Sequence, residues 1–285
     1  MVKPAQRAAR KIAFINMKGG VGKTTLAVSL AWELAKTKKV LLVDIDPQFN
    51  ATQWLISTAA YVTWLKTKKT IYHILSPQIA AASLFKKAPK TKREVSLKDS
   101  ICTIEHSGIK LDLLPSDLRL IELDAASRGT ENRLRQYLDG KPSEKYDYIL
   151  IDCPPTSSLY TQAAYLAADA YIVPIKPDPL SVLGLPLLER SLAQYEEMHG
   201  HKLKQLGLVL SLVRSTGAMQ AAIKGLRKAY PGQVFASELP MSTGIAEAVG
   251  EGQPLQEFHK TKTALSGELS AICTEFIQKA EQALP

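Results

Sequence analysis

Residues 18–25 decide the fold, and they read Lys18-Gly19-Gly20-Val21-Gly22-Lys23-Thr24-Thr25. An apolar run at 12–15 precedes them, and a helical pattern follows from 26 to 34. A glycine-rich turn between a strand and a helix is typical of a phosphate-binding loop, because glycines let backbone N–H groups approach phosphate oxygens. The helix that begins near Gly22 directs the positive end of its dipole at the same anion. The pattern therefore predicts a nucleotide site built on residues 19–25.

Three polar side chains of this loop have distinct expected roles. Lys23 can reach the β- and γ-phosphates, and the hydroxyl of Thr24 can ligate Mg²⁺, which prefers oxygen ligands. Lys18 is a second lysine, placed five residues before the usual one. It is either a solvated surface charge or a second cation beside the phosphates, and the loop around it favours the second interpretation.

Two carboxylates follow the next buried run, at residues 40–43. Asp44 and Asp46 occupy alternate positions, so both side chains point to one side of the strand. They lie at its carboxyl end, where open α/β sheets bind their ligands. A carboxylate there can orient an attacking water by accepting its hydrogen bond, which favours Asp46 as a catalytic residue. Asp44 either ligates the metal or caps the following helix, and the sequence leaves both roles open.

A third carboxylate ends the apolar run Tyr148-Ile149-Leu150-Ile151-Asp152. An apolar strand that ends in Asp, downstream of a phosphate loop, has the form of a Walker B strand, whose Asp holds Mg²⁺ through water. The two motifs together predict ATP and Mg²⁺ as cofactors.

The chain of 285 residues, 46% of them hydrophobic, is long enough for one α/β domain at 12–285, preceded by a basic tail at 1–11. The segment 58–110 is predicted as a variable, basic excursion at the sheet edge. Three cysteines without paired spacing and the lack of an eighteen-residue apolar run favour a protein of the reducing cytoplasm. The formal charge of +9 suits an anionic partner.

The remaining chain alternates between strand and helix patterns. Strands are expected at 109–114, 148–151, 170–175, 206–214 and 234–239, and helices at 118–138 with a break near Gly129, 183–199, 217–230 and 267–283. This alternation predicts a doubly wound, mostly parallel sheet with helices on both faces.

The two-lysine loop and residues 43–52, Val-Asp-Ile-Asp-Pro-Gln-Phe-Asn-Ala-Thr, resemble the ParA/MinD family of P-loop ATPases, and most of all the small ParA-type partition ATPases. The resemblance extends from Ile12 to the last helix. It implies that Lys18 reaches across an ATP-sandwiched dimer to the partner's phosphates and that Asp46 positions the attacking water. It also places Pro179 near the nucleotide base.

The resemblance further implies a working cycle. The family forms an ATP-bound homodimer, binds DNA nonspecifically and hydrolyses ATP weakly until a ParB-like or other activator protein stimulates it. Such a protein works in the cytoplasm, in association with the nucleoid. The sequence names neither the cargo nor the activator.

Basic residues late in the chain are the candidates for contacts with DNA phosphates, which carry no sequence information. They are Arg214, Lys224, Arg227, Lys228, Lys260 and Lys262. Partition ATPases often have an Arg in the turn after the last strand's proline, but this chain has Ser242, Thr243 and Gly244 after Pro240. A solvated basic face is the alternative interpretation.

Two rival functions are considered. A MinD-like, membrane-associated regulator of division or flagella needs a basic amphipathic tail, and the polar face of the last helix carries Glu268, Glu275, Lys279 and Glu281. That mixed face argues against membrane binding. Metabolic and redox relatives with the same loop need a cysteine pair, and the spacing of the three cysteines provides none.

Overall fold

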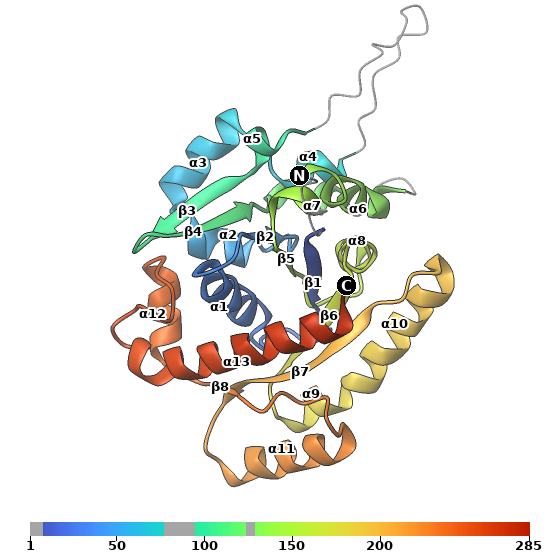
Figure 1. Cartoon of the computed structure of the whole chain (residues 1–285), viewed down its shortest axis with the longest axis vertical. Coiled ribbons are helices and arrows are strands. Elements are labelled where there is room, and N and C mark those ends of the chain that lie inside the picture. Colours follow the sequence, from blue (N-terminus) through green and yellow to red (C-terminus); the bar gives the residue numbers. More distant parts are fainter. Residues whose placement is uncertain (1–7, 77–94, 124–128) are drawn as a thin grey trace, which may run out of the picture.

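One eight-stranded sheet organises the protein in the computed structural model, which describes residues 8–76, 95–123 and 129–285 (Figure 1). The strand order is β3-β4-β2-β5-β1-β6-β7-β8. Neighbouring strands run parallel, except that β3 runs antiparallel to β4. The strands are β1 (Arg10–Phe14), β2 (Val40–Asp44), β3 (Cys102–His106), β4 (Ile109–Leu114), β5 (Tyr148–Asp152), β6 (Ala170–Ile175), β7 (Lys204–Val213) and β8 (Leu239–Pro240).

Helices supply the crossovers that parallel strands require. They are α1 (Lys23–Ala35), α2 (Asn50–Leu55), α3 (Thr58–Thr67), α4 (Ile71–Leu75), α5 (Leu97–Ser100), α6 (Arg133–Leu138), α7 (Lys141–Lys145), α8 (Leu159–Ala167), α9 (Pro179–Leu183), α10 (Leu185–His199), α11 (Gly217–Ala229), α12 (Gly244–Gly250) and α13 (Lys262–Ala283). Short 3₁₀ turns, η1 (Leu118–Leu123) and η2 (Thr130–Asn132), lie between β4 and α6. The predicted doubly wound, mostly parallel architecture is confirmed.

Alternate side chains of the central strands enter two separate cores. On β1, Ile12 and Phe14 pack in the core that contains residues of α1 and α13, whereas Ala13 packs in the core with residues of α8 and α10. Every residue of β1, β2 and β5 is buried. Strands covered on both faces read as continuous apolar runs, which is why the sequence shows no alternation there.

The apolar stripe of α13 belongs to the core on the α1 side. Leu265, Leu269, Ile272 and Phe276 are buried there, and α13 lies along α1 (Figure 1). These side chains are therefore not free to enter a lipid surface. Within the described ranges, no helix has the length and apolar character needed to cross a membrane.

The start of β1 corrects the predicted basic tail. Arg10 and Lys11 lie in the sheet and are only 7% and 9% exposed. The Lys11 N–H donates to the Asp169 carboxylate at 2.9 Å, and the Arg10 guanidinium donates to the hydroxyl of Tyr148 at 3.1 Å. The Lys11 ammonium pairs with the carboxylates of Asp139 and Asp169, which offsets the cost of burying its charge. Among the described residues, Nε and Nη2 of Arg10 are buried without a hydrogen-bond partner.

The segment 58–110 contains more regular structure than the predicted excursion. Three short helices, α3 to α5, lead into the β3–β4 hairpin at the sheet edge. Ser107 and Gly108 form its two-residue turn with φ values of 49° and 79°, the left-handed geometry that suits right-twisted strands. The basic cluster at 86–93 lies outside the described residues.

The predicted strand at 234–239 is wrong for most of its length. Val234 makes one isolated bridge to Leu208, and β8 contains only Leu239 and Pro240. Side chains take the place of strand partners in this segment: the Arg227 guanidinium donates to the carbonyl oxygens of Phe235 and Ala236, both at 3.1 Å, and the Glu275 carboxylate accepts the N–H of Ala236 at 2.8 Å. The last helix begins at Lys262, five residues before the predicted start at 267.

Candidate functional site

The phosphate loop joins β1 to α1 at the carboxyl end of the sheet. Gly20 and Gly22 have φ values of 70° and 81°, a backbone that residues with a Cβ rarely adopt. Gly22 is the N-cap of α1, and no side chain of the described residues accepts a hydrogen bond as its cap. The first N–H groups of α1 therefore remain available to an anion. Val21 anchors the loop, because its carbonyl oxygen accepts a hydrogen bond from Ser211 of β7.

Lys23 lies inside the loop rather than in solvent. Its side chain is buried, the residue being 7% exposed, and its Nζ donates to the carbonyl oxygen of Lys18 at 3.1 Å. Burial lowers the pKa of Lys23, and the nearby carboxylates of Asp152 and Asp46 oppose that shift. A buried ammonium with one backbone partner suits an anion held by the loop.

The predicted carboxylates converge beside the loop. Asp44 and Asp152 are register partners on the adjacent parallel strands β2 and β5, and Asp152 is also paired with Phe14 of β1. Asp46 follows two residues after Asp44. The sheet order places these acids together, although about a hundred residues separate them along the chain.

Asp44 has a structural role in this arrangement. It is fully buried, and its Oδ2 accepts the backbone N–H and the hydroxyl of Thr52, both at 2.8 Å. Its Oδ1 accepts the N–H of Asp46 at 3.2 Å. Since Thr52 lies in α2, these contacts tie that helix to the end of β2, as expected for the capping alternative. They leave the predicted metal contact of Asp44 without support.

Asp46 begins a tight turn that presents its side chain to the site. Its carbonyl oxygen accepts the N–H of Phe49 at 2.8 Å, and its Oδ1 accepts the N–H of Gln48 at 2.9 Å. Phe49 has φ 45°, an uncommon left-handed conformation for a residue with a Cβ. Burial raises the pKa of Asp46, while the Gln48 N–H and the Lys23 charge lower it. The carboxylate is held, and one of its oxygens remains to accept a further hydrogen bond.

Asp152 has the character expected of a magnesium partner. It is fully buried, and neither carboxylate oxygen accepts a hydrogen bond from any described residue. Burial raises its pKa to about 7, and nearby Thr24 partly lowers it although its hydroxyl does not reach hydrogen-bonding geometry. An orphaned buried carboxylate signals a missing cation or water. In the described ranges no cluster of three acidic, His or Cys ligands forms, and Mg²⁺ commonly uses only one or two protein oxygens. Thr24 and Asp152 therefore fit a hydrated Mg²⁺.

Lys18 points away from the other loop residues, toward the start of α9. Its Nζ lies 2.8 and 3.0 Å from the two oxygens of Asp178 and 3.0 Å from the hydroxyl of Ser181. Burial raises the pKa of Asp178, but the Lys18 ammonium and the Ser181 N–H outweigh it and lower the pKa. In a single chain, the second lysine is thus held by that chain's own carboxylate.

A pocket of about 820 Å³ opens in front of the loop. It is lined by most of the predicted nucleotide residues, namely Gly19, Gly20, Gly22, Lys23, Thr24 and Thr25, and by Asp46. It continues along Gln48, Phe49 and α2 to Tyr61 of α3. Of the remaining predicted contacts, Val21 is buried, and Pro179 is the first residue of α9.

Sequence comparisons agree with this geometry. A family sequence model described as an AAA domain matches residues 9–205. The chain is 31% identical over 253 residues to the chromosome partitioning protein ParA of Caulobacter vibrioides, an alignment that covers 86% of each chain. It is 30% identical over 246 residues to the sporulation initiation inhibitor protein Soj of Bacillus subtilis, covering 86% of this chain and 89% of Soj. This chain belongs to the ParA family of P-loop ATPases.

Solved structures share the fold of this ParA-family protein. A putative plasmid partition protein of Borrelia burgdorferi B31, bound to AMPPNP, superimposes with a TM-score of 0.74 at 22% identity, over 95% of this chain and 99% of that chain. An ATP complex of a McdA variant from Cyanothece gives a TM-score of 0.74 at 21% identity, over 95% and 97% of the two chains.

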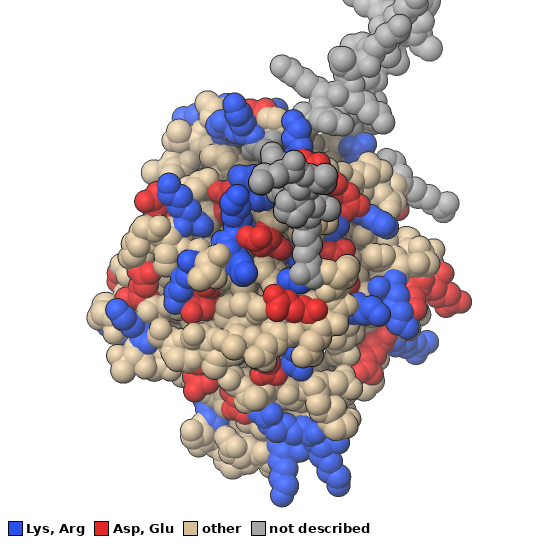
Figure 2. All heavy atoms as spheres, in the orientation of Figure 1, with Lys and Arg blue, Asp and Glu red and all other residues tan. Residues whose placement is uncertain are grey.

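The six basic residues predicted to bind DNA do not form one patch in this ParA-family structure. Lys224 and Lys228 are exposed on α11, at the end of the molecule where Lys and Arg side chains project (Figures 1 and 2). Lys260 and Lys262 lie at the start of α13, beside α12 (Figure 1). Arg214 follows β7.

Two of these six side chains already have intramolecular partners. Besides the two carbonyl oxygens it holds, Arg227 lies 3.1 Å from a carboxylate oxygen of Glu238. Lys260 pairs with Glu247. Arg227 in particular stabilises the segment after α11, so its assignment as a DNA contact is not supported.

Asp178 and Ser181, which hold Lys18, were not predicted as site residues. The available signal was the position of Asp178 just after the carboxyl end of β6, because the other acids also lie at the carboxyl ends of their strands. Ser116 and Thr52, which contact the Asp44–Asp46 segment, were not predicted as site residues either. Thr52 ends the stretch 43–52, but no local pattern shows that its hydroxyl reaches Asp44.

Proposed function

We propose that this protein is a partition or positioning ATPase that dimerises around ATP and Mg²⁺. The ATP dimer binds DNA nonspecifically, and a ParB-like or other activator protein stimulates hydrolysis. The cycle of DNA binding and release positions a plasmid, a chromosome region or a protein assembly, and it places the protein in the cytoplasm on the nucleoid. The observation that carries the proposal is the second lysine, Lys18, on a phosphate loop that already contains Lys23.

Each residue of the site has a defined part in this function. The loop N–H groups and Lys23 bind the phosphates, and Asp46 accepts a hydrogen bond from the attacking water. Thr24 directly and Asp152 through water hold Mg²⁺, which supplies positive charge against the phosphate oxygens. Phosphoryl transfer depends mainly on positioning and charge neutralisation, and these residues supply both.

Lys18 makes dimerisation depend on the nucleotide. Its ammonium leaves Asp178 and reaches the phosphates bound by the partner subunit, so each subunit completes the other's site. Because a γ-phosphate strengthens this contact, ATP stabilises the dimer and hydrolysis weakens it. The role corresponds to that of an arginine finger supplied in trans.

Exposed lysines on α11 support the proposed DNA contact. Lys224 and Lys228 are exposed on α11, and the chain carries a formal charge of +9. Contacts of this kind bind phosphates without reading base edges. The buried stripe of α13 gives the membrane alternative no matching support.

Light scattering of Lys18→Ala with ATP tests the proposal. The wild type should form dimers, whereas Lys18→Ala should remain monomeric and still bind ATP with an affinity within about threefold of wild type, because Lys23 and the loop are intact. Lys23→Ala, the matched control in the same loop, should lose nucleotide affinity instead. A Lys18→Ala protein that dimerises normally with ATP would contradict the proposed role.

Two further measurements test the proposed activator protein and the choice between DNA and a membrane. ATPase rate and DNA retention, with and without the protein encoded beside this one, should show stimulation by the neighbour. Liposome flotation with ATP separates the two functions, since a membrane regulator would float and a DNA-binding partition ATPase would not.

A further inference from the structure

The turn after β4 holds the backbone of Asp46 from behind. Ser116 is fully buried, and its Oγ donates to the carbonyl oxygen of Asp46 at 2.7 Å. The same oxygen accepts the N–H of Phe49, which closes the turn that carries the Asp46 side chain. Both lone pairs of this carbonyl are therefore used, one within the turn and one by a strand end 70 residues away.

A second bond from the same turn reaches the other end of the Asp44–Thr52 segment. The N–H of Ser116 donates to the Thr52 hydroxyl at 2.9 Å, and that hydroxyl donates to Asp44 at 2.8 Å. Ser116, Thr52 and Asp44 are all fully buried. Water does not compete for hydrogen bonds between buried groups, so such bonds hold their geometry. Ser116 therefore supports the segment at two points.

The outer side of Ser116 is held by α3. The hydroxyl of Tyr61 donates to the carbonyl oxygen of Ser116 at 2.9 Å, and the Tyr61 ring stacks on Phe49 with centroids 5.7 Å apart and planes 17° from parallel. Tyr61 thus contacts both the Asp46 turn and the residue that supports it. It also lines the pocket, as Asp46 does.

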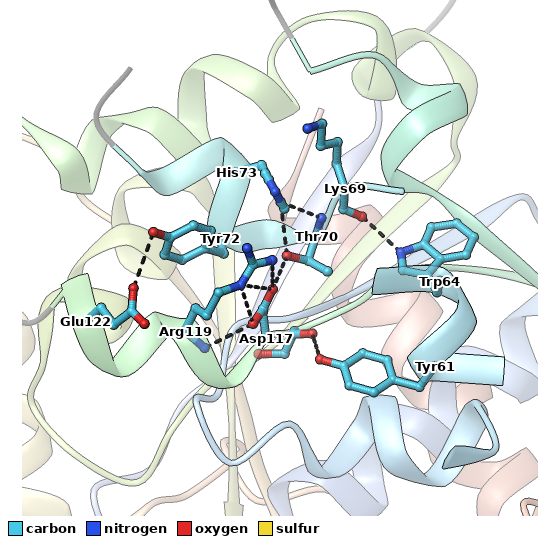
Figure 3. Close-up of polar contacts among 10 residues, drawn as sticks. Tyr61, Trp64, Lys69, Thr70, Tyr72, His73, Asp117, Arg119 and Glu122 are labelled. Atoms are coloured by element: carbon cyan, nitrogen blue, oxygen red, sulfur yellow. Dashed lines mark hydrogen bonds and ion pairs between the residues drawn. The ribbon is translucent and has the colours of Figure 1, made fainter. Parts of the chain in front are cut away.

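Asp117, the residue after Ser116, is held by side chains on both sides, and Figure 3 shows its contacts with Thr70 and Arg119. Asp117, 2% exposed, accepts the hydroxyl of Thr70 at 2.8 Å and the Nε of Arg119 at 3.0 Å. Arg119 stacks over the ring of Tyr72 at 4.6 Å. The turn is therefore anchored to α4 and η1, and it is a rigid support for the loop in front of it.

We propose that Ser116 is a positioning residue for Asp46 and that Tyr61 couples α3 to the same turn. The inference rests on the proposed function, in which Asp46 orients the attacking water. Ser116 contacts the Asp46 backbone and not its carboxylate, so it acts through placement. If the carboxylate that orients the water is displaced, the rate of ATP hydrolysis falls. Nucleotide binding by the phosphate loop does not depend on that displacement and stays normal.

Three variants test this proposal. Ser116→Ala removes the support, Ser116→Thr keeps the hydroxyl, and Tyr61→Phe removes one hydroxyl from a half-buried ring. Ser100→Ala is the matched control, because Ser100 is also fully buried and its Oγ donates to a backbone carbonyl, that of Ser96 at 2.9 Å, in α5 away from the site.

Steady-state ATP hydrolysis should separate positioning from folding. Ser116→Ala should lower kcat roughly five- to tenfold with KM within about twofold of wild type, Tyr61→Phe should lower kcat about two- to threefold, and Ser116→Thr should restore most of the rate. Ser100→Ala should reduce thermal stability with kcat unchanged. An unchanged kcat in both Ser116→Ala and Tyr61→Phe would overturn the proposal, as would an equal loss in Ser100→Ala.

Amide hydrogen exchange of the nucleotide-free protein gives an independent result. Ser116→Ala should speed exchange at residues 46–52 by roughly tenfold while the phosphate-loop amides stay as in wild type. Unchanged exchange at 46–52 would contradict the inference even where hydrolysis is absent. If the wild type does not hydrolyse ATP, or Asp46→Asn hydrolyses at the wild-type rate, the proposed function is wrong and the exchange result alone decides the role of Ser116.

Discussion

The ion pair of Lys18 with Asp178 determines how freely Lys18 can leave its own chain. Two carboxylate oxygens and the Ser181 hydroxyl hold the ammonium within 3.0 Å. Asp178→Asn removes the negative charge. In the wild type, Oδ1 of Asp178 accepts the N–H of Ser181 at 2.8 Å, and the side-chain oxygen of the Asn can accept the same bond. The variant therefore weakens the hold on Lys18 while the first turn of α9 keeps its cap.

The expected effect follows from the exposure of the pair. The side chains of Lys18 and Asp178 are 35% and 24% exposed, so water screens part of their attraction. A pair of this kind contributes about 1 kcal/mol. Two such pairs break when a dimer forms, so Asp178→Asn should favour the dimer by about 2 kcal/mol, a Kd about 30-fold lower.

Sedimentation velocity in ATP measures this Kd, with both proteins also carrying Asp46→Ala to slow hydrolysis. Asp139→Asn is the matched control, because it neutralises the carboxylate paired with Lys11 near the amino end of β1, whereas Asp178 follows the carboxyl end of β6. The control should leave the dimer Kd unchanged. If Asp178→Asn dimerises no more tightly than its parent, Lys18 does not leave Asp178 to form the dimer, and the reasoning fails.

Three further predictions concern the metal, the supporting turn and the DNA surface. Asp152→Asn should raise the free energy of unfolding of the nucleotide-free protein by roughly 1–3 kcal/mol, because it removes a buried charge without a hydrogen-bond partner. The same variant should lose the gain in nucleotide affinity that Mg²⁺ provides, and urea unfolding and nucleotide titration with EDTA check the two effects. Burial alone would raise the pKa of Asp117, but hydrogen bonds from Arg119 and Thr70 lower it, so Asp117→Asn should be less stable than wild type above about pH 5. This difference should shrink below about pH 4, as the wild-type carboxylate takes up a proton, and urea unfolding at both pH values measures it. Lys224→Glu with Lys228→Glu should weaken DNA binding and reduce the slope of log K against log salt by about 2.

Specific results would contradict each of these three predictions. An Asp152→Asn protein that is less stable without nucleotide would mean that the attraction between this carboxylate and the Lys23 ammonium outweighs the cost of burying the carboxylate. A stability difference for Asp117→Asn that stays constant as the pH falls below about 4 would remove the charge as the cause. For the DNA surface, charge reversal at Lys38 and Lys141, which are exposed and lie outside α11, is the control. An equal loss in that control would indicate net charge and not a surface on α11.

The sequence alone predicted the parts of the protein that depend on neighbouring residues. The loop at 18–25 needs glycines where φ is positive, and a buried parallel strand needs an unbroken apolar run. The strands β1, β2 and β5 were therefore recognisable, as were the terminal acids of β2 and β5. The β3–β4 hairpin was missed, although Ser107-Gly108 is a two-residue turn signal and Cys102 to His106 alternates between half-buried and exposed residues. That edge strand could have been predicted from the same local physics.

Tertiary structure alone decided which distant side chains meet. Lys18 and Asp178 are separated by 160 residues, Ser116 and Asp46 by 70, and only the order of the strands brings each pair together. Arg227 is a similar case, since only the folded chain brings its guanidinium to the carbonyl oxygens of Phe235 and Ala236. Backbone conformation depends mainly on residues a few positions away. Hydrogen bonds between strand ends instead depend on which ends the folded sheet places side by side, and no short stretch of sequence contains that information.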